Sequence, residues 1–95
     1  MNVSVIEIDV PGGAENAGPG AVHARVLVDI DGQQTWYSLR VEPFLLPESD
    51  ARLVVAGPEL LERFRSHQRT MHRIQQLVGR AVRQAPVHLP QLVAA

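Results

Sequence analysis

The sequence predicts an α+β domain in which an antiparallel sheet of three or four strands, ordered as a meander, packs one face against a single long amphipathic helix. Apolar and polar residues alternate over residues 3–10 and 21–41, which is the period of half-buried strands. Asp31-Gly32 interrupts the second stretch with a hairpin signal. Residues 58–84 instead repeat apolar residues at steps of four and three, which is the period of a helix.

The composition is that of one globular domain spanning residues 1–95, with 45% hydrophobic and 20% charged residues. Only 4% of residues are aromatic, so the core must be aliphatic. The absence of cysteine excludes disulfides, thiolate metal sites and cysteine nucleophiles. No segment approaches the roughly 20 apolar residues that cross a bilayer, and Glu7 and Asp9 interrupt the first apolar run. We therefore expect no membrane span, no secretory signal and a cytoplasmic protein.

The hairpin over residues 21–41 is the most strongly specified element. A two-residue turn at Asp31-Gly32 suits the positive φ angles that such a turn requires. This turn would place Val28 opposite Thr35 and bring the apolar residues of both strands onto one face. The other face would be polar except for Leu27 opposite Trp36. We expect this pair to form an exposed patch that is a candidate contact surface.

The N-terminal stretch predicts a strand followed by a loop. Ile6, Ile8 and Val10 alternate with acidic residues, so we expect these three side chains to share the buried face of a strand over residues 3–10. Residues 11–20 contain four glycines and two prolines. Such a segment predicts a flexible loop without regular structure.

Two segments on either side of the expected helix have weaker patterns. Residues 52–56 could form a further strand or a short helix, and their adjacent valines, followed by Gly57-Pro58, favour a strand. Residues 85–95 are expected to form an extended tail. Within this tail, residues 87–90 could add a short edge strand, and the last five residues are expected to fray.

The expected helix over residues 58–84 has two distinct faces. Pro58 suits its first position, and Ala85-Pro86 ends it. Its apolar seam consists of Leu60, Phe64, His67, Met71, Ile74, Val78 and Ala81. Its opposite side carries what we call the arginine face, a candidate binding surface made of Arg65, Arg69, Arg73, Arg80 and Arg83.

Charge is divided unevenly along the chain. Residues 1–57 hold eight acidic residues and three arginines, a net charge of −5, whereas residues 58–95 hold two acidic residues and six arginines, a net charge of +4. The arginine face is then either a solvated surface, a contact for an anionic protein or a contact for nucleic acid. We favour protein contacts over nucleic acid because the whole chain has a net charge of −1 and no aromatic residue interleaves the arginines.

The length of the helix raises the question of what covers its apolar end. A helix of 27 residues is about 40 Å long, whereas the expected strands span only about 17–30 Å. A homodimer, which we favour, or the tail folding back through Val87 and Leu89 would cover the overhang. The candidate residues of a dimer seam are His67, Met71, Ile74 and Val78.

No pattern of catalytic or metal-binding residues is present. His67 and His72 are five residues apart, which places them on different sides of a helix. The glycine-rich segment lacks the Lys-Ser/Thr pair of a phosphate-binding loop, and no serine lies in a nucleophile elbow. We therefore expect no enzyme, no cofactor and no metal, and instead a non-enzymatic binding or regulatory module.

A hairpin, a helix that reads Leu-Leu-Glu-Arg-Phe-Arg-Ser-His-Gln-Arg over residues 60–69, and a Val-His-Leu tail at residues 87–89 together resemble a family of small uncharacterised bacterial proteins. That family places an arginine four residues after the helix phenylalanine and an aliphatic residue three further on. This chain has Gln68 and Met71 at those positions. The resemblance implies an α+β fold and a bacterial cytoplasmic source, and it implies no catalytic residue.

Overall fold

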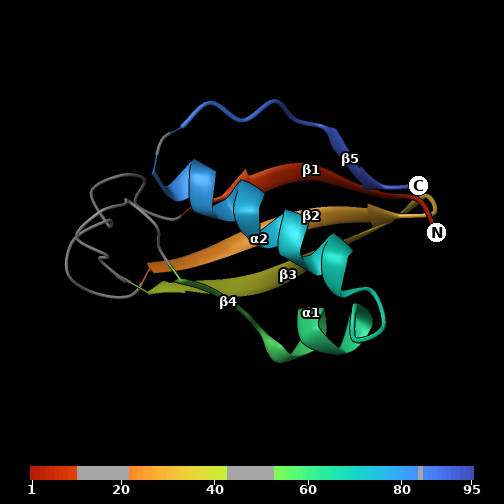
Figure 1. The fold of residues 1–95 in the computed structure, drawn as a ribbon. Coiled ribbons are helices and arrows are strands. Elements are labelled where there is room, and N and C mark those ends of the chain that lie inside the picture. The colour runs from red at the N-terminus through yellow and green to blue at the C-terminus, as the bar shows by residue number, and fades with distance from the viewer. Residues whose placement is uncertain (11–21, 43–52, 84) are drawn as a thin grey trace.

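A computed structural model describes residues 1–10, 22–42, 53–83 and 85–95 of the chain (Figure 1). The loop expected over residues 11–20 lies outside the described residues. The described elements, in chain order, are β1 (Val3–Asp9), β2 (Val22–Ile30), β3 (Gln33–Glu42), β4 (Leu53–Ala56), α1 (Pro58–Arg63), α2 (Gln68–Val82) and β5 (Gln91–Ala94).

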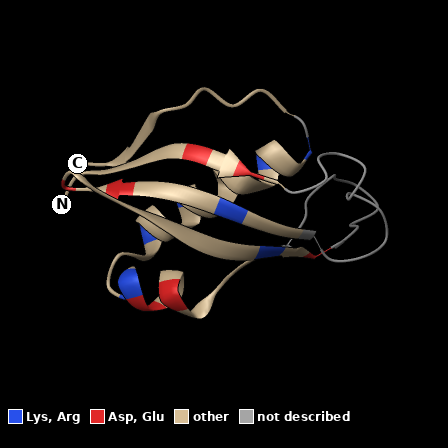
Figure 2. Cartoon of the chain, turned by 180° about the vertical axis from the view of Figure 1, so that it is seen from behind, with Lys and Arg blue, Asp and Glu red and all other residues tan. Residues whose placement is uncertain are grey.

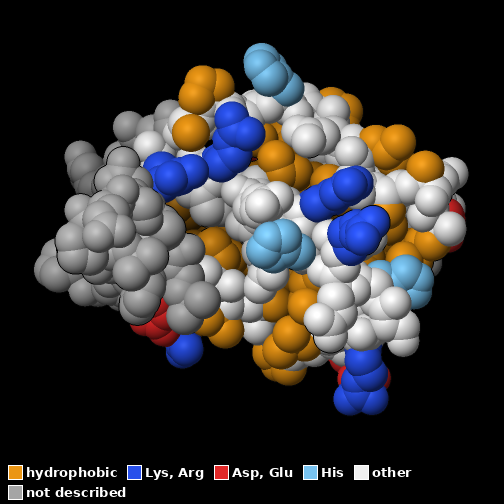
Figure 3. All heavy atoms as spheres, in the orientation of Figure 1, with side chains coloured by type: hydrophobic (Ala, Val, Ile, Leu, Met, Phe, Trp, Pro, Cys, Tyr) orange, Lys and Arg blue, Asp and Glu red, His pale blue; other side chains and the backbone are white. Residues whose placement is uncertain are grey.

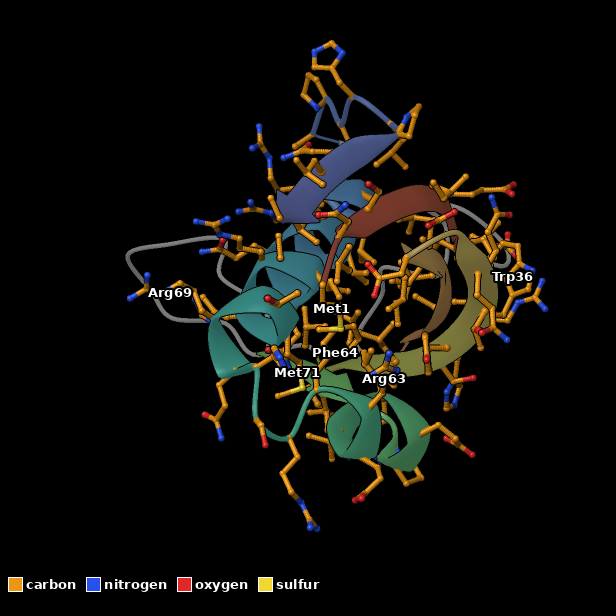
Figure 4. The ribbon with its side chains drawn as sticks, turned by 90° about the vertical axis from the view of Figure 1, so that its right-hand side faces the viewer. Met1, Trp36, Arg63, Phe64, Arg69 and Met71 are labelled. Atoms are coloured by element: carbon orange, nitrogen blue, oxygen red, sulfur yellow. The ribbon has the colours of Figure 1, made fainter. Side chains whose placement is uncertain are left out.

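The five strands form one antiparallel sheet in the order β4-β3-β2-β1-β5. This order confirms the predicted α+β class and the antiparallel sheet, with β1 to β4 arranged as a meander. It also confirms the strand expected near residues 52–56, which is β4. The sheet has one strand more than the four that we allowed. Viewed from its end, it curls into a half-barrel around α2 (Figure 4). Both edges of the sheet therefore approach the same helix.

The hairpin has the predicted register. Val28 lies opposite Thr35, and Leu27 lies opposite Trp36. Asp31 and Gly32 have φ angles of 51° and 94°, as a two-residue turn of this kind requires. The Asp31 carboxylate accepts a hydrogen bond of 2.7 Å from the Asn2 backbone N–H. The turn is therefore tied to the N-terminal strand as well as to its own hairpin.

A bulge in β1 changes which of its side chains face the core. The pairing with β2 shifts between Val5 and Glu7, so Ile6 is an extra residue. Val3 and Val5 are buried on one side of this bulge, and Ile8 packs against the core on the other side. The prediction that Ile6 shares a face with Ile8 was wrong. Regular alternation would have turned either the two valines or Ile8 away from the core.

The prediction of a single helix over residues 58–84 was wrong, because the chain forms two helices separated by a turn over residues 64–67. α1 packs on β3, whereas α2 packs on β1, β4 and β5. A straight rod of about 40 Å would exceed the longest dimension of the molecule, 37 Å. Ser66 and His67 have modest helix propensity. The break allows both helices to follow the concave face.

The core lies between the concave face of the sheet and the two helices. Phe64 is its largest fully buried side chain and comes from the turn between the helices. The other core residues are almost all aliphatic, as the composition predicted. They include Leu39 and Val41 from β3, Leu60 from α1, and Ile74, Leu77, Val78 and Val82 from α2.

The tail forms a strand four residues later than we expected. β5 pairs with β1 at residues 91–94, where we predicted fraying, and residues 87–90 form no strand. Val87 and Leu89 instead pack against the core on the way to β5. The tail thus joins the core, and the apolar residues Val78 and Val82 near the end of α2 are buried, so no overhanging apolar end exists on the described helix. This result removes the argument from helix length for a homodimer.

Gly57 is required by a close approach of two backbones. Its N–H donates to the Ser38 carbonyl at 2.9 Å, and an added Cβ would lie 2.7 Å from that carbonyl oxygen. We expect Gly57→Ala to lower the free energy of unfolding by about 1–3 kcal/mol, measured by urea denaturation.

Gly79→Ala is the matched control. A Cβ at Gly79 would lie 3.3 Å from the Val54 Cγ2 atom, which can move, and alanine favours a helix by about 1 kcal/mol. We expect this variant to stay within about 1 kcal/mol of the natural protein. A Gly57→Ala variant that is as stable as the Gly79→Ala variant would contradict the proposed clash.

Candidate binding site

The outer side of α2 carries four arginines in one line, which we call the basic stripe: Arg69, Arg73, Arg80 and Arg83. All four are exposed. Arg69 and Arg73 form one pair, Arg80 and Arg83 form another, and Gln76 lies between the two pairs. The line from Arg69 to Arg83 therefore advances in steps of four, three, four and three residues. These steps keep the five side chains within an arc of about 80° on a regular helix. On this face of the molecule, arginines gather in two groups and acidic side chains appear only at the margin (Figure 3).

Arg65 does not belong to the stripe. It lies in the turn between α1 and α2, and its guanidinium is 3.3 Å from the Glu62 carboxylate. Both side chains are more than two-thirds exposed, so this ion pair adds little to stability. The helix break therefore removes one of the five arginines that we expected on a common face.

Two side chains of α2 bind the backbone of the two edge strands. The Arg73 guanidinium donates to the Val93 carbonyl in β5 at 2.9 Å. The Gln75 amide donates to the Val54 carbonyl in β4, also at 2.9 Å. Val93 is the extra residue where the β1–β5 pairing shifts, so Arg73 satisfies a carbonyl that the bulge leaves without a ladder partner. These contacts fix α2 with its basic stripe turned outward.

A groove with a volume of about 750 Å³ runs along this side of the molecule. Arg73 and Arg80 of α2 line it, together with Arg83 directly after the helix and residues 91–93 of β5. No aspartate or glutamate lines the groove in the described part of the chain. Leu92 adds an apolar side chain that is 58% exposed. The groove therefore combines positive charge with an exposed apolar side chain.

The sheet does not neutralise the stripe through any contact between described residues. Asp9 pairs with Arg25 at 2.8 Å, and Glu42 pairs with Arg40 at 2.7 Å. Viewed from behind, the strands carry both acidic and basic residues on the face of the sheet that is turned away from α2 (Figure 2). Among the described residues, no arginine of the stripe takes part in an ion pair.

The expected patch of Leu27 and Trp36 lies on the convex face and is smaller than its sequence suggests. Trp36 is 41% exposed, whereas Leu27 is half-buried. The Arg25 guanidinium lies 5.0 Å from the centre of the Trp36 ring, a distance typical of a cation–π contact. Trp36 and Arg69 lie on opposite sides of the molecule (Figure 4). The two candidate surfaces thus cannot contact a small partner together.

The candidate residues of a dimer seam are divided by the fold. Ile74 and Val78 are fully buried in the core of the chain itself, so they are not available to a second copy. His67 is exposed at the N-terminal end of α2, and Met71 is half-buried beside the core. A homodimer stays a prediction, but these four residues do not form one surface that could carry it.

Residues 1–10, 22–42, 53–83 and 85–95 contain no group of three or more His, Cys, Asp or Glu side chains placed to hold a metal ion. Neither α1 nor α2 has the length and apolar character needed to cross a membrane.

Sequence reasoning missed Gln76 and Leu92. The spacing of the arginines could have identified Gln76, because it lies three residues after Arg73 on the same line. No comparable signal marked Leu92. Its place beside the stripe depends on β5 returning to the edge of β1, which is a contact between the two ends of the chain.

Comparisons of the chain with protein-family models, with curated proteins and with solved structures gave no match. The resemblance to small bacterial proteins is not tested by these comparisons and stays an expectation.

The adjacent glutamines of α2 provide a test of the edge contact. Gln75→Ala removes the donor to the Val54 carbonyl, and we expect a loss of about 1 kcal/mol in the free energy of unfolding. Gln76→Ala alters an exposed residue and should change stability by less than about 0.5 kcal/mol. Both variants gain the same helix propensity, and Gln76 loses only a long, exposed contact of 3.4 Å with His72, so the difference between the two in urea denaturation reports chiefly the Gln75 hydrogen bond. Equal stability of the two variants would show that the contact contributes nothing.

Proposed function

We propose that the protein is a non-enzymatic binding module whose basic stripe and adjoining groove contact an acidic segment of a partner protein. The observation that carries the proposal is the groove lined by three arginines, and by no acidic residue within the described part of the chain. Arginine pairs with carboxylates through two parallel hydrogen bonds. An exposed line of arginines is therefore suited to a carboxylate-rich surface.

The remainder of the surface supports a protein rather than a nucleic acid as the partner. The one described aromatic side chain that is exposed, Trp36, lies on the opposite side of the molecule from the stripe (Figure 4), where it cannot stack on bases bound to α2. Leu92 offers an apolar contact at the edge of the groove, which an amphipathic protein segment can use.

The proposal is tested with two probes of equal charge, a glutamate-rich peptide and a single-stranded oligothymidylate. We expect the natural protein to bind the peptide at low salt, with affinity that falls as salt screens the charges. The double variant Arg80→Gln/Arg83→Gln should bind the peptide about 3- to 30-fold more weakly, because it removes two exposed ion pairs between the stripe and the glutamates of the peptide. Fluorescence anisotropy measures both affinities.

The double variant Arg63→Gln/Arg65→Gln is the matched control. It removes the same charge from α1 and the turn and should leave peptide affinity within about twofold if the stripe is the contact. Equal loss in both double variants would show that net charge, and not the stripe, determines binding. Tighter binding of the oligothymidylate than of the peptide would instead favour a nucleic-acid partner.

A further inference from the structure

The arginines of the basic stripe form two pairs with a neutral gap between them. Measured along the axis of α2 from Arg69, the other three lie about 6, 16 and 21 Å away. Gln76 occupies the gap and approaches His72 at 3.4 Å between their side-chain nitrogens. The stripe therefore presents positive charge at each end and a neutral amide in the middle. This spacing sets a condition on any ligand that engages all four arginines.

We infer that the partner segment is a helix that lies alongside α2, with two pairs of acidic residues separated by two helical turns. A second helix has the same rise per residue as α2. The four arginines are spaced by four, seven and three residues, so acidic residues spaced by four, seven and four fall within one residue, about 1.5 Å, of all of them in either direction. An extended strand repeats its same-face side chains about every 6.6 Å. Its third same-face side chain would fall about 13 Å from the first, between Gln76 at about 10 Å and Arg80 at about 16 Å, so no strand position would align with Arg80.

The groove beside the stripe supplies a place for the apolar side of such a helix. Leu92 stands at the groove, 58% exposed, on β5. Arg73 holds this strand beside α2 through the Val93 carbonyl, so the distance between Leu92 and the stripe is fixed by the fold. A helix with one leucine next to its acidic line can therefore contact the arginines and Leu92 together. This amphipathic acidic pattern is the recognition chemistry that we assign to the site.

The inference deepens the proposed function and rests on it. Two alanine-rich helical peptides of identical composition separate the two proposals. In the aligned peptide, four glutamates stand at spacings of four, seven and four, which places them on one face. In the dispersed peptide, the four glutamates are five residues apart, which spreads them around the helix. Both peptides carry one leucine and the same net charge.

We expect the aligned peptide to bind about 5- to 30-fold more tightly than the dispersed peptide, measured by fluorescence anisotropy at low salt. Equal affinity would overturn the helical inference while leaving the proposed acidic partner intact. No binding of either peptide at low salt would contradict the proposed function itself. Oligothymidylate that binds as tightly as the aligned peptide would also overturn the inference.

Two exposed leucines test the apolar contact. Leu92→Ser should weaken binding of the aligned peptide by about 3- to 10-fold, because it removes the most exposed of the apolar side chains that line the groove. Leu61→Ser changes a leucine that is 46% exposed on α1 and should leave affinity unchanged. Urea denaturation of both variants separates loss of binding from loss of folding. Equal affinity of the two variants would remove Leu92 from the site.

Discussion

The position of α2 in the concavity of the curled sheet is the constraint on which the other features depend. Ile74 and Val78 bury the inner side of the helix against the sheet, while Arg73 and Gln75 bind the backbones of the two opposite edge strands. Unpaired edge carbonyls favour contacts with other chains. One helix therefore supplies part of the core and also satisfies a carbonyl at each edge of the sheet.

The same placement determines which side chains form the exposed surface of the molecule. Once Ile74 faces the sheet, the periodicity of the helix turns Arg69, Arg80 and Arg83 outward. The convex face is polar for the complementary reason, since no described element covers it (Figure 2). Its arginines are paired with acidic neighbours across or along the strands. Positive charge is thus neutralised on the sheet but left available on the helix.

Local patterns predicted local structure well. The hairpin register follows from Asp31-Gly32 and from alternation within 20 residues, and the arginines of α2 share a face because helical spacing dictates it. The break between the helices was not predictable from periodicity, because Leu60, Phe64 and Met71 continue the apolar spacing across it. β5 was missed for a related reason. Four residues next to the C-terminus become a strand only through pairing with β1, and a contact of this kind leaves no period in the sequence.

Arg73 connects stability with binding. Its guanidinium already donates one hydrogen bond, to Val93, and a guanidinium has five N–H donors in a planar fork. Arg73 can therefore keep its hydrogen bond to the Val93 carbonyl while its remaining N–H donors stay available to a ligand in the groove. Lysine could not do both in a fixed geometry, because its donors rotate around a single point charge. The use of arginine at this position means that the contact that holds β5 beside α2 also orients one charge of the basic stripe.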